Sequence, residues 1–121
     1  MNQSSILIQV ANVIGNYYAV EATEGQKVYE LIKKAITENQ KIMLSFLNIE
    51  MMTTAFLNTA IGQLYNDFSE EQIKDSLTLD NMSDSGKVIL KRVVDTAKLY
   101  YKDPDTFQRM QESINEILKQ H

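Results

Sequence analysis

The spacing of apolar residues changes several times in the first half of the chain. In residues 5–13, Ile6, Ile8 and Val10 alternate with Leu7, Gln9 and Ala11, which predicts a strand with one clearly apolar face. Residues 17–20 contain two aromatic residues and one β-branched residue, Tyr17, Tyr18 and Val20, and predict a second short strand. Because only Ile14, Gly15 and Asn16 separate the two segments, we expect an antiparallel hairpin.

Helical spacing begins at Thr23, which forms a capping-box pattern with Gln26 and predicts a helix that ends near Asn39. Its apolar positions are Val28, Leu31, Ile32, Ala35 and Ile36. The apolar run that follows, residues 42–46, is too short to cross a membrane and predicts a strand covered on both faces. Asn48 and Glu50 end this run.

A second helix is predicted directly after this strand. The side-chain oxygens of Thr53 and Thr54 can accept the free N–H groups of a first helical turn. Helical spacing then continues through Phe56, Leu57, Ala60, Ile61 and Leu64. A strand that leads into a helix start is typical of α/β proteins.

The second half predicts a short helix capped by Ser69, a strand at Leu77–Leu79, a long helix capped by Ser83 or Asp84, and a final helix at 104–121. We expect the long helix to bury Val88, Ile89, Val93, Val94, Ala97 and either Tyr100 or Tyr101. The final helix has an apolar side formed by Phe107, Met110, Ile114, Ile117 and Leu118. The predicted fold is therefore α/β, one domain over residues 1–121, with helices covering a small mixed sheet of about four strands.

The amino-acid composition argues against some classes of function, among them nucleic-acid binding and membrane insertion. The chain has 121 residues, 44% of them hydrophobic, and a net charge of −4, which disfavours a broad electrostatic grip on nucleic acid. It contains no cysteine, no long apolar run and no basic N-terminal region. We therefore expect a cytoplasmic protein that has no direct contact with membranes or nucleic acid.

Residues suited to catalysis are sparse. The single histidine is His121, and the four glycines are isolated and form no phosphate-binding loop. We expect no enzymatic activity, no cofactor and no metal. Glu50 and Asp80 follow predicted strands and either hold a cation or act as turn residues. Four of the basic residues of the long helix form either a solvated face or a phosphate-binding patch, namely Lys87, Lys91, Arg92 and Lys98.

Thr53 and Thr54 are the sharpest candidates for regulation. A capping threonine and a phosphorylated threonine use the same geometry, because a helix N-terminus favours negative charge. A phosphate on either hydroxyl would also change any surface that docks on this helix.

The segment from Ile42 to Tyr65 resembles STAS-like domains of unknown function, bacterial and prophage proteins related to sulfate-transporter and anti-sigma-factor-antagonist domains. The similarity extends more weakly over residues 5–101. Its motif is matched by Phe46, Ile49, Glu50, Thr53, Thr54, Phe56, Leu57, Asn58, Ala60, Ile61, Gly62 and Leu64. The chain departs from the motif at Ser45, where an acidic residue is common, at Asn48, where glycine is common, and at Ala55, which replaces a glycine of the related antagonists.

This resemblance implies a regulatory domain that docks a partner, such as a histidine-kinase-type ATPase or another signalling protein, through residues 50–64. The implied phosphorylation site is Thr54 or, as second choice, Thr53. The implied partner-binding residues are Glu50, Met52, Thr53, Thr54, Asn58 and Gln63. Two alternatives remain open: a phage-encoded or defence-related inhibitor of a nucleic-acid-handling complex, and a domain that binds a small molecule or acts as a minor hydrolase at the strand ends. The oligomeric state is also open.

Overall fold

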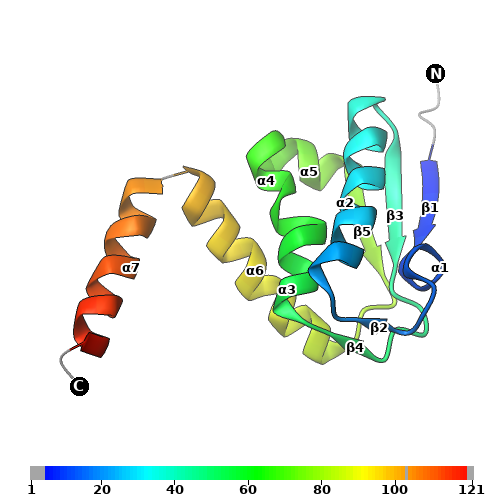
Figure 1. The fold of residues 1–121 in the computed structure, drawn as a ribbon. Helices are drawn as coiled ribbons and strands as arrows, with labels where there is room; N and C mark the ends of the chain where they lie inside the picture. Colours follow the sequence, from blue (N-terminus) through cyan, green and yellow to red (C-terminus); the bar gives the residue numbers. More distant parts are fainter. Residues whose placement is uncertain (1–4, 103, 120–121) are drawn as a thin grey trace.

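A parallel sheet organises the chain. The computed structural model describes residues 5–102 and 104–119, with the side chains at 102, 104–108 and 110–111 left undescribed (Figure 1). Strands β1 (Ser5–Gln9), β3 (Lys41–Ser45) and β5 (Leu77–Asp80) pair in the order β1-β3-β5, all parallel. The α/β class is confirmed, and this main sheet has three strands.

The predicted antiparallel hairpin is wrong. The chain leaves β1 as a short helix, α1 (Val10–Ile14), which ends at Gly15 in the left-handed region with φ 75°. Strand β2 (Tyr18–Ala19) then pairs in parallel with β4 (Met51–Met52), far along the chain, as a separate two-stranded sheet. Val10 and Ile14 are both buried and lie four residues apart, which is a helical spacing. The apolar residues at the end of the predicted strand therefore fit a helix equally well.

Helix α2 (Ala22–Thr37) follows its predicted apolar stripe, except that Leu31 is exposed. The predicted capping box is wrong, because the helix begins after Glu21 and no side chain caps it. After β4 the chain forms one nearly continuous helical segment: α3 (Thr54–Leu57), the π-helix η1 (Asn58–Gly62) and α4 (Leu64–Asp67). Helix α5 (Glu70–Ser76) is capped by Ser69 as predicted.

Two long helices complete the chain, α6 (Asp84–Lys102) and α7 (Pro104–Lys119). Ser83 caps α6 by accepting the Gly86 N–H, and Val93 and Ala97 are buried as expected. Val88, Tyr100 and Tyr101 are exposed, which corrects the predicted stripe of α6. Helix α7 makes its main contacts with α6 and projects away from the rest of the molecule, at the left of Figure 1. The predicted burial of Phe107 and Met110, and the position of His121, lie outside the described residues.

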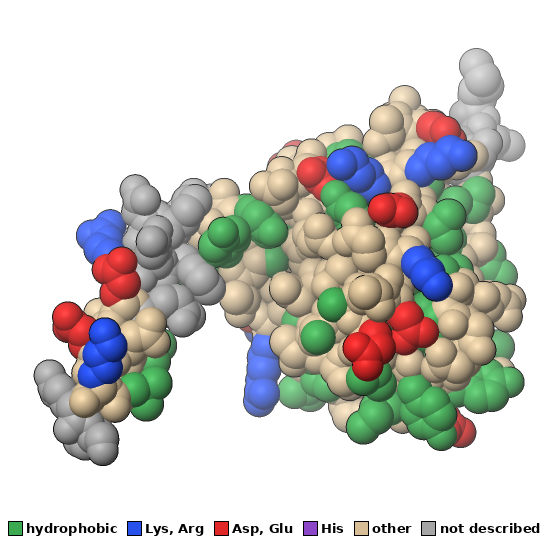
Figure 2. Space-filling view, viewed as in Figure 1, with side chains coloured by type: hydrophobic (Ala, Val, Ile, Leu, Met, Phe, Trp, Pro, Cys, Tyr) green, Lys and Arg blue, Asp and Glu red, His purple; other side chains and the backbone are tan. Residues whose placement is uncertain are grey.

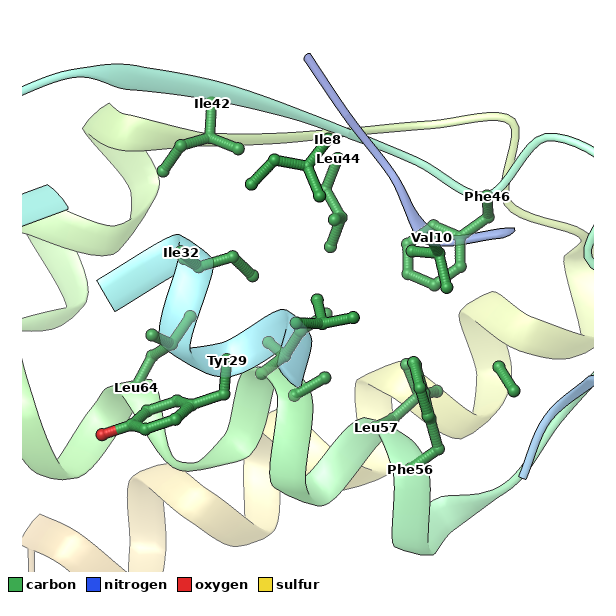
Figure 3. Close-up of a cluster of buried hydrophobic side chains, with 14 of the residues drawn as sticks. Ile8, Val10, Tyr29, Ile32, Ile42, Leu44, Phe46, Phe56, Leu57 and Leu64 are labelled. Carbon is green, nitrogen blue, oxygen red and sulfur yellow. The ribbon is translucent and has the colours of Figure 1, made fainter. Parts of the chain in front are cut away.

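The core fills the space between the main sheet and the helices. Figure 3 shows Ile8, Ile42 and Leu44 pointing from the strands toward side chains of the helices, among them Ile32, Leu57 and Leu64. The opposite face of the sheet is more open: Leu7 is 59% exposed and Met43 is half-buried. Strand β3 is therefore covered fully on one face, whereas both faces were expected to be covered. Of the helices the structure describes, none is long and apolar enough to cross a membrane.

Candidate functional site

Thr53 fixes the start of the predicted docking helix. Its Oγ1 accepts the Phe56 N–H at 3.1 Å, as an N-cap residue does. The same hydroxyl donates to the Val20 carbonyl at 2.6 Å, and the Thr53 N–H donates to the Ala19 carbonyl at 3.1 Å. Thr53 is thus committed to joining the helix start to the chain that follows β2.

Thr54, in contrast to Thr53, has a side chain that is not bonded into the described part of the fold. It is exposed, stands first in α3, and its hydroxyl has no hydrogen-bond partner among the described residues. Because the first N–H groups of a helix have no intrahelical acceptor, the backbone N–H groups of Thr54 and Ala55 are available beside this hydroxyl. Of the two predicted phosphorylation candidates, only Thr54 presents a hydroxyl that an enzyme can reach without dismantling a cap.

Glu50 and Met52 lie on either side of Met51, next to the start of α3. The Glu50 N–H donates to the Tyr17 carbonyl at 2.8 Å. The Glu50 side chain receives a hydrogen bond from Tyr18, and this bond, followed by the charge of Glu50, raises the Tyr18 pKa. Met52 is half-buried and its terminal methyl group lies over Gly86 of α6.

The π-helix η1 sets the positions of Asn58 and Gln63. The Gln63 N–H donates to the Asn58 carbonyl at 3.1 Å, five residues back, which is the hydrogen bond that defines a π turn. The Gln63 side-chain amide also donates to Gln26 Oε1 of α2 at 2.9 Å, which holds this residue against its neighbour. Asn58 is exposed, whereas Gln63 is half-buried and already engaged. Single π turns occur frequently at functional sites.

An exposed apolar patch lies next to Glu50 and Met52, and the sequence pattern did not reveal it. Tyr18 and Met51 face each other in the β2-β4 ladder, and Leu47 lies in the turn between β3 and β4. The exposed fractions that define the patch are Tyr17 52%, Tyr18 52%, Leu47 48% and Met51 55%. Hydrophobic side chains gather at the lower edge of Figure 2, where β2 and β4 lie in Figure 1. The only sequence signal was the adjacent Met51-Met52 pair, of which Met51 is the more exposed.

The strand ends hold a closed polar cluster. Ser45, only 4% exposed, accepts hydrogen bonds at Oγ from the Leu47 N–H at 3.2 Å and from Asn81 Nδ2 at 3.3 Å. Asp80 accepts hydrogen bonds from Asn81, while Glu50 is bonded to Tyr18, so the structure engages the two predicted carboxylates separately. Across residues 5–102 and 104–119, no three His, Asp or Glu side chains gather closely enough to hold a metal ion.

Two of the four basic residues singled out on α6, Lys91 and Lys98, are paired with acidic neighbours. Lys91 lies 3.1 Å from Asp95, and Lys98 lies 2.7 Å from Glu70 of α5. The Lys98–Glu70 pair borders a hollow of about 250 Å³ whose other walls are Tyr65, Phe68, Ser69 and Tyr101. Of the two interpretations left open for this basic face, the phosphate-binding one retains Lys87 and Arg92 as cations for which the described part of the chain shows no acidic partner.

Comparison with known proteins gives one match. Residues 24–87, more than half of the chain, match the model of the family described as STAS-like domain of unknown function. The matched segment runs from α2 to the first turn of α6 and contains the whole of residues 50–64; β1, α1, β2 and α7 lie outside it. No curated protein and no solved structure matches the chain.

Proposed function

Because this chain belongs to the family of STAS-like domains of unknown function, we propose that it is a non-enzymatic regulatory domain that docks a protein partner through residues 50–64. The partner we propose is a histidine-kinase-type ATPase or another signalling protein. The observation that carries the proposal is the contrast between two adjacent threonines: the Thr53 hydroxyl is tied into the fold by two hydrogen bonds, and Thr54 stands exposed beside it.

The docking surface extends beyond the residues that sequence patterns indicate. Tyr and Met are enriched in protein interfaces, and an exposed cluster of such residues supports partner binding rather than burial in a core. The apolar patch supplies contact area, while Thr54 and Asn58 supply the polar groups beside it. We assign Gln63 and Thr53 a positioning role, because their side chains are already bonded within the fold.

Phosphorylation of Thr54 is the proposed control. A phosphate brings about −1.5 to −2 charges at neutral pH. At Thr54 it would be stabilised within its own chain by the free N–H groups of the first helical turn. The same charge would lie close to the apolar patch, where desolvating it against a partner is costly, so phosphorylation would release the partner.

The test is affinity capture from native cells with four versions of the intact protein, followed by mass spectrometry of partners and of both threonines. The versions are wild type, Thr54→Glu, Met51→Asp and Thr96→Glu; Thr96 is an exposed threonine of α6 and serves as the matched control. We expect an ATPase-type partner whose capture falls about tenfold with Thr54→Glu or Met51→Asp, equivalent to about 1.4 kcal/mol, and stays unchanged with Thr96→Glu.

Phosphate should be found on Thr54 of the wild type and be absent from Thr53. Capture that is equal for all four versions would refute the docking surface. Recovery of a nuclease or another nucleic-acid-handling complex, in a strongly salt-dependent manner and with both threonines unmodified, would replace this proposal with the inhibitor function.

A further inference from the structure

The hollow of about 250 Å³ described above lies between the junction of α4 with α5 and the C-terminal half of α6, elements that Figure 1 shows. Its walls are Tyr65, Phe68, Ser69, Glu70, Lys98 and Tyr101. A cavity of about 150 Å³ is enough to hold benzene, and sites for drug-sized ligands occupy about 300–1,000 Å³. The hollow therefore fits a ligand with a single ring and one small substituent.

Three of the walls are aromatic rings that the fold holds in place. Tyr65 and Phe68 are half-buried and pack against the hydrophobic core. Tyr101 meets Tyr100 edge to face, with ring centres 4.8 Å apart and planes at 85°. Aromatic side chains prefer offset or edge-to-face contacts with another ring. These walls therefore favour a flat aromatic ligand over an aliphatic ligand of the same size.

The hollow has an excess of positive charge, although the whole chain has a net charge of −4. The Glu70 carboxylate lies 2.7 Å from the Lys98 ammonium and 3.3 Å from the Lys74 ammonium, so two cations share one anion. Two further carboxylates act on the wall residues, and each has a cation of its own; the pairs are Asp67 with Lys33 at 3.7 Å and Asp95 with Lys91 at 3.1 Å. An anionic ligand is therefore favoured over a cationic one.

Two hydrogen-bond donors of the hollow are available to such an anion. Among the residues that the structure describes, Glu70 is the only acceptor bonded to Lys98, so two of the three N–H groups of this ammonium remain. The Tyr65 hydroxyl has no hydrogen-bond partner in the described part of the chain. Burial raises the Tyr65 pKa and the charge of Lys98 opposes this rise, which shows that the two groups are close enough to act on one ligand.

From the size, rings, charge and donors of the hollow we propose that it binds a small aromatic carboxylate of the benzoate type. The ring of the ligand lies against Tyr65, Phe68 and Tyr101. Its carboxylate accepts hydrogen bonds from the Lys98 ammonium and the Tyr65 hydroxyl, while Lys98 keeps its bond to Glu70. None of the six wall residues belongs to the docking residues 50–64, and the purified protein binds this ligand without a partner, so the test is independent of the proposed docking.

The experiment is NMR titration of the intact protein at neutral pH with benzoate, benzamide and cyclohexanecarboxylate. Benzamide keeps the ring and loses the charge, whereas cyclohexanecarboxylate keeps the charge and loses the aromatic ring. We expect benzoate to shift the ring signals of Tyr65, Phe68 and Tyr101 with a dissociation constant on the order of 1 mM or below, and the other two compounds to bind at least about tenfold more weakly. Benzoate that leaves these signals unshifted, or that binds no more tightly than benzamide, would overturn the proposal.

Three variants test the two donors separately. Lys98→Met should weaken benzoate binding at least about tenfold, and Tyr65→Phe, which keeps the ring and loses the hydroxyl, about threefold or more. Lys74→Met is the matched control, because it removes the other lysine from the same Glu70 carboxylate but stands outside the walls of the hollow; we expect a change of less than about threefold. Equal losses in the two lysine variants would indicate general charge attraction and refute the site. If Lys98→Met fails to fold, Tyr65→Phe decides, since unchanged benzoate affinity in that variant would contradict the assigned hydrogen bond.

Discussion

The hydroxyl of Tyr29 donates a hydrogen bond to the carboxylate of Asp67, 38 residues further along the chain, and so joins α2 to α4. Tyr29 is 7% exposed, and Lys33 lies 3.7 Å from the Asp67 carboxylate and 5.7 Å from the centre of the Tyr29 ring. Burial, followed by the bond to Asp67, raises the Tyr29 pKa to about 12. The pair holds α4 against α2.

Replacing Tyr29 by Phe should lower the free energy of unfolding by about 1–2 kcal/mol at neutral pH, because a buried hydroxyl donating to a charged acceptor is lost while Lys33 still neutralises Asp67. The raised pKa favours the neutral hydroxyl in the folded state. The neutral Tyr29 hydroxyl therefore makes its full contribution to the free energy of unfolding below pH 10. This contribution is lost as the pH rises toward 12. Chemical denaturation of both proteins between pH 7 and 12 measures this; a wild type and a Tyr29→Phe variant with parallel pH profiles would contradict it.

Substitution of Thr53 should cost far more stability than substitution of Thr54. Thr53→Val removes both the cap of α3 and the bond to Val20, and we expect a loss of about 1–2 kcal/mol, whereas Thr53→Ser should keep most of it. Thr54→Val should stay within about 0.5 kcal/mol of the wild type, because its side chain is exposed. Urea denaturation of the three variants provides the measurement, and equal losses at both positions would refute the division of roles between the threonines.

Gly25 permits close contact between α2 and the docking helix. A Cβ added there would lie 2.6 Å from the Phe56 carbonyl oxygen, a backbone atom that cannot move aside cheaply. Gly25→Ala should therefore destabilise the protein by about 1–3 kcal/mol. The control is Gly62→Ala in η1, where the closest atom is the side-chain oxygen of Asn58 at 2.8 Å, which can rotate away. We expect a change of less than about 1 kcal/mol there, measured by thermal unfolding.

The pKa of Glu70 should depend more on Lys98 than on Lys74. Hydrogen bonds from Lys98 at 2.7 Å and from Lys74 at 3.3 Å lower the Glu70 pKa, with Lys98 as the larger cause. Because the pKa of Glu70 is lowered in the folded state, its charged form stabilises the fold at pH values above the usual pKa of glutamate. This stabilisation is lost as the pH falls through the lowered pKa. Carboxyl NMR titration should show the Glu70 pKa rising more in Lys98→Met than in Lys74→Met; the opposite order would show that the contact between α5 and α6 is weaker than its geometry suggests.

The features of the fold that were predicted correctly depend mostly on residues that are close together in the sequence. The caps at Thr53, Ser69 and Ser83, and the strands β3 and β5, depend on residues close together in sequence, and their prediction was sound. The pairing of β2 with β4 depends on Tyr18 meeting Met51, and no property of the segment around Tyr18 specifies that partner.

In the candidate site, too, features that depend on nearby residues were predicted and features that depend on distant residues were not. The sequence identified Thr53 and Thr54 but not their different roles, because the Thr53 hydroxyl is engaged by Val20, a residue distant in sequence. The π turn at η1, with its hydrogen bond from Gln63 to Asn58, was also not predicted, because helical spacing of apolar residues does not distinguish a π turn from an α-helix; η1 packs against α2 and α6. The exposed Tyr17 and Tyr18 were read as strand residues because aromatic side chains favour strands, whether or not they are buried.

The parallel order of the main sheet also bears on how the chain folds during synthesis. Ser5 pairs with Lys41 and Ile42 pairs with Leu77, so each ladder must wait for a strand made much later. Sheets built from such distant segments form slowly, because the entropy of closing the loop between two strands is lost before their pairing contributes any favourable free energy. The ribosome has to release β5 before β3 gains its second neighbour, and until then one edge of β3 is open to other chains. The helices from α3 to α5 are synthesised before β5, so they are available to cover the apolar face of β3 before the sheet is complete.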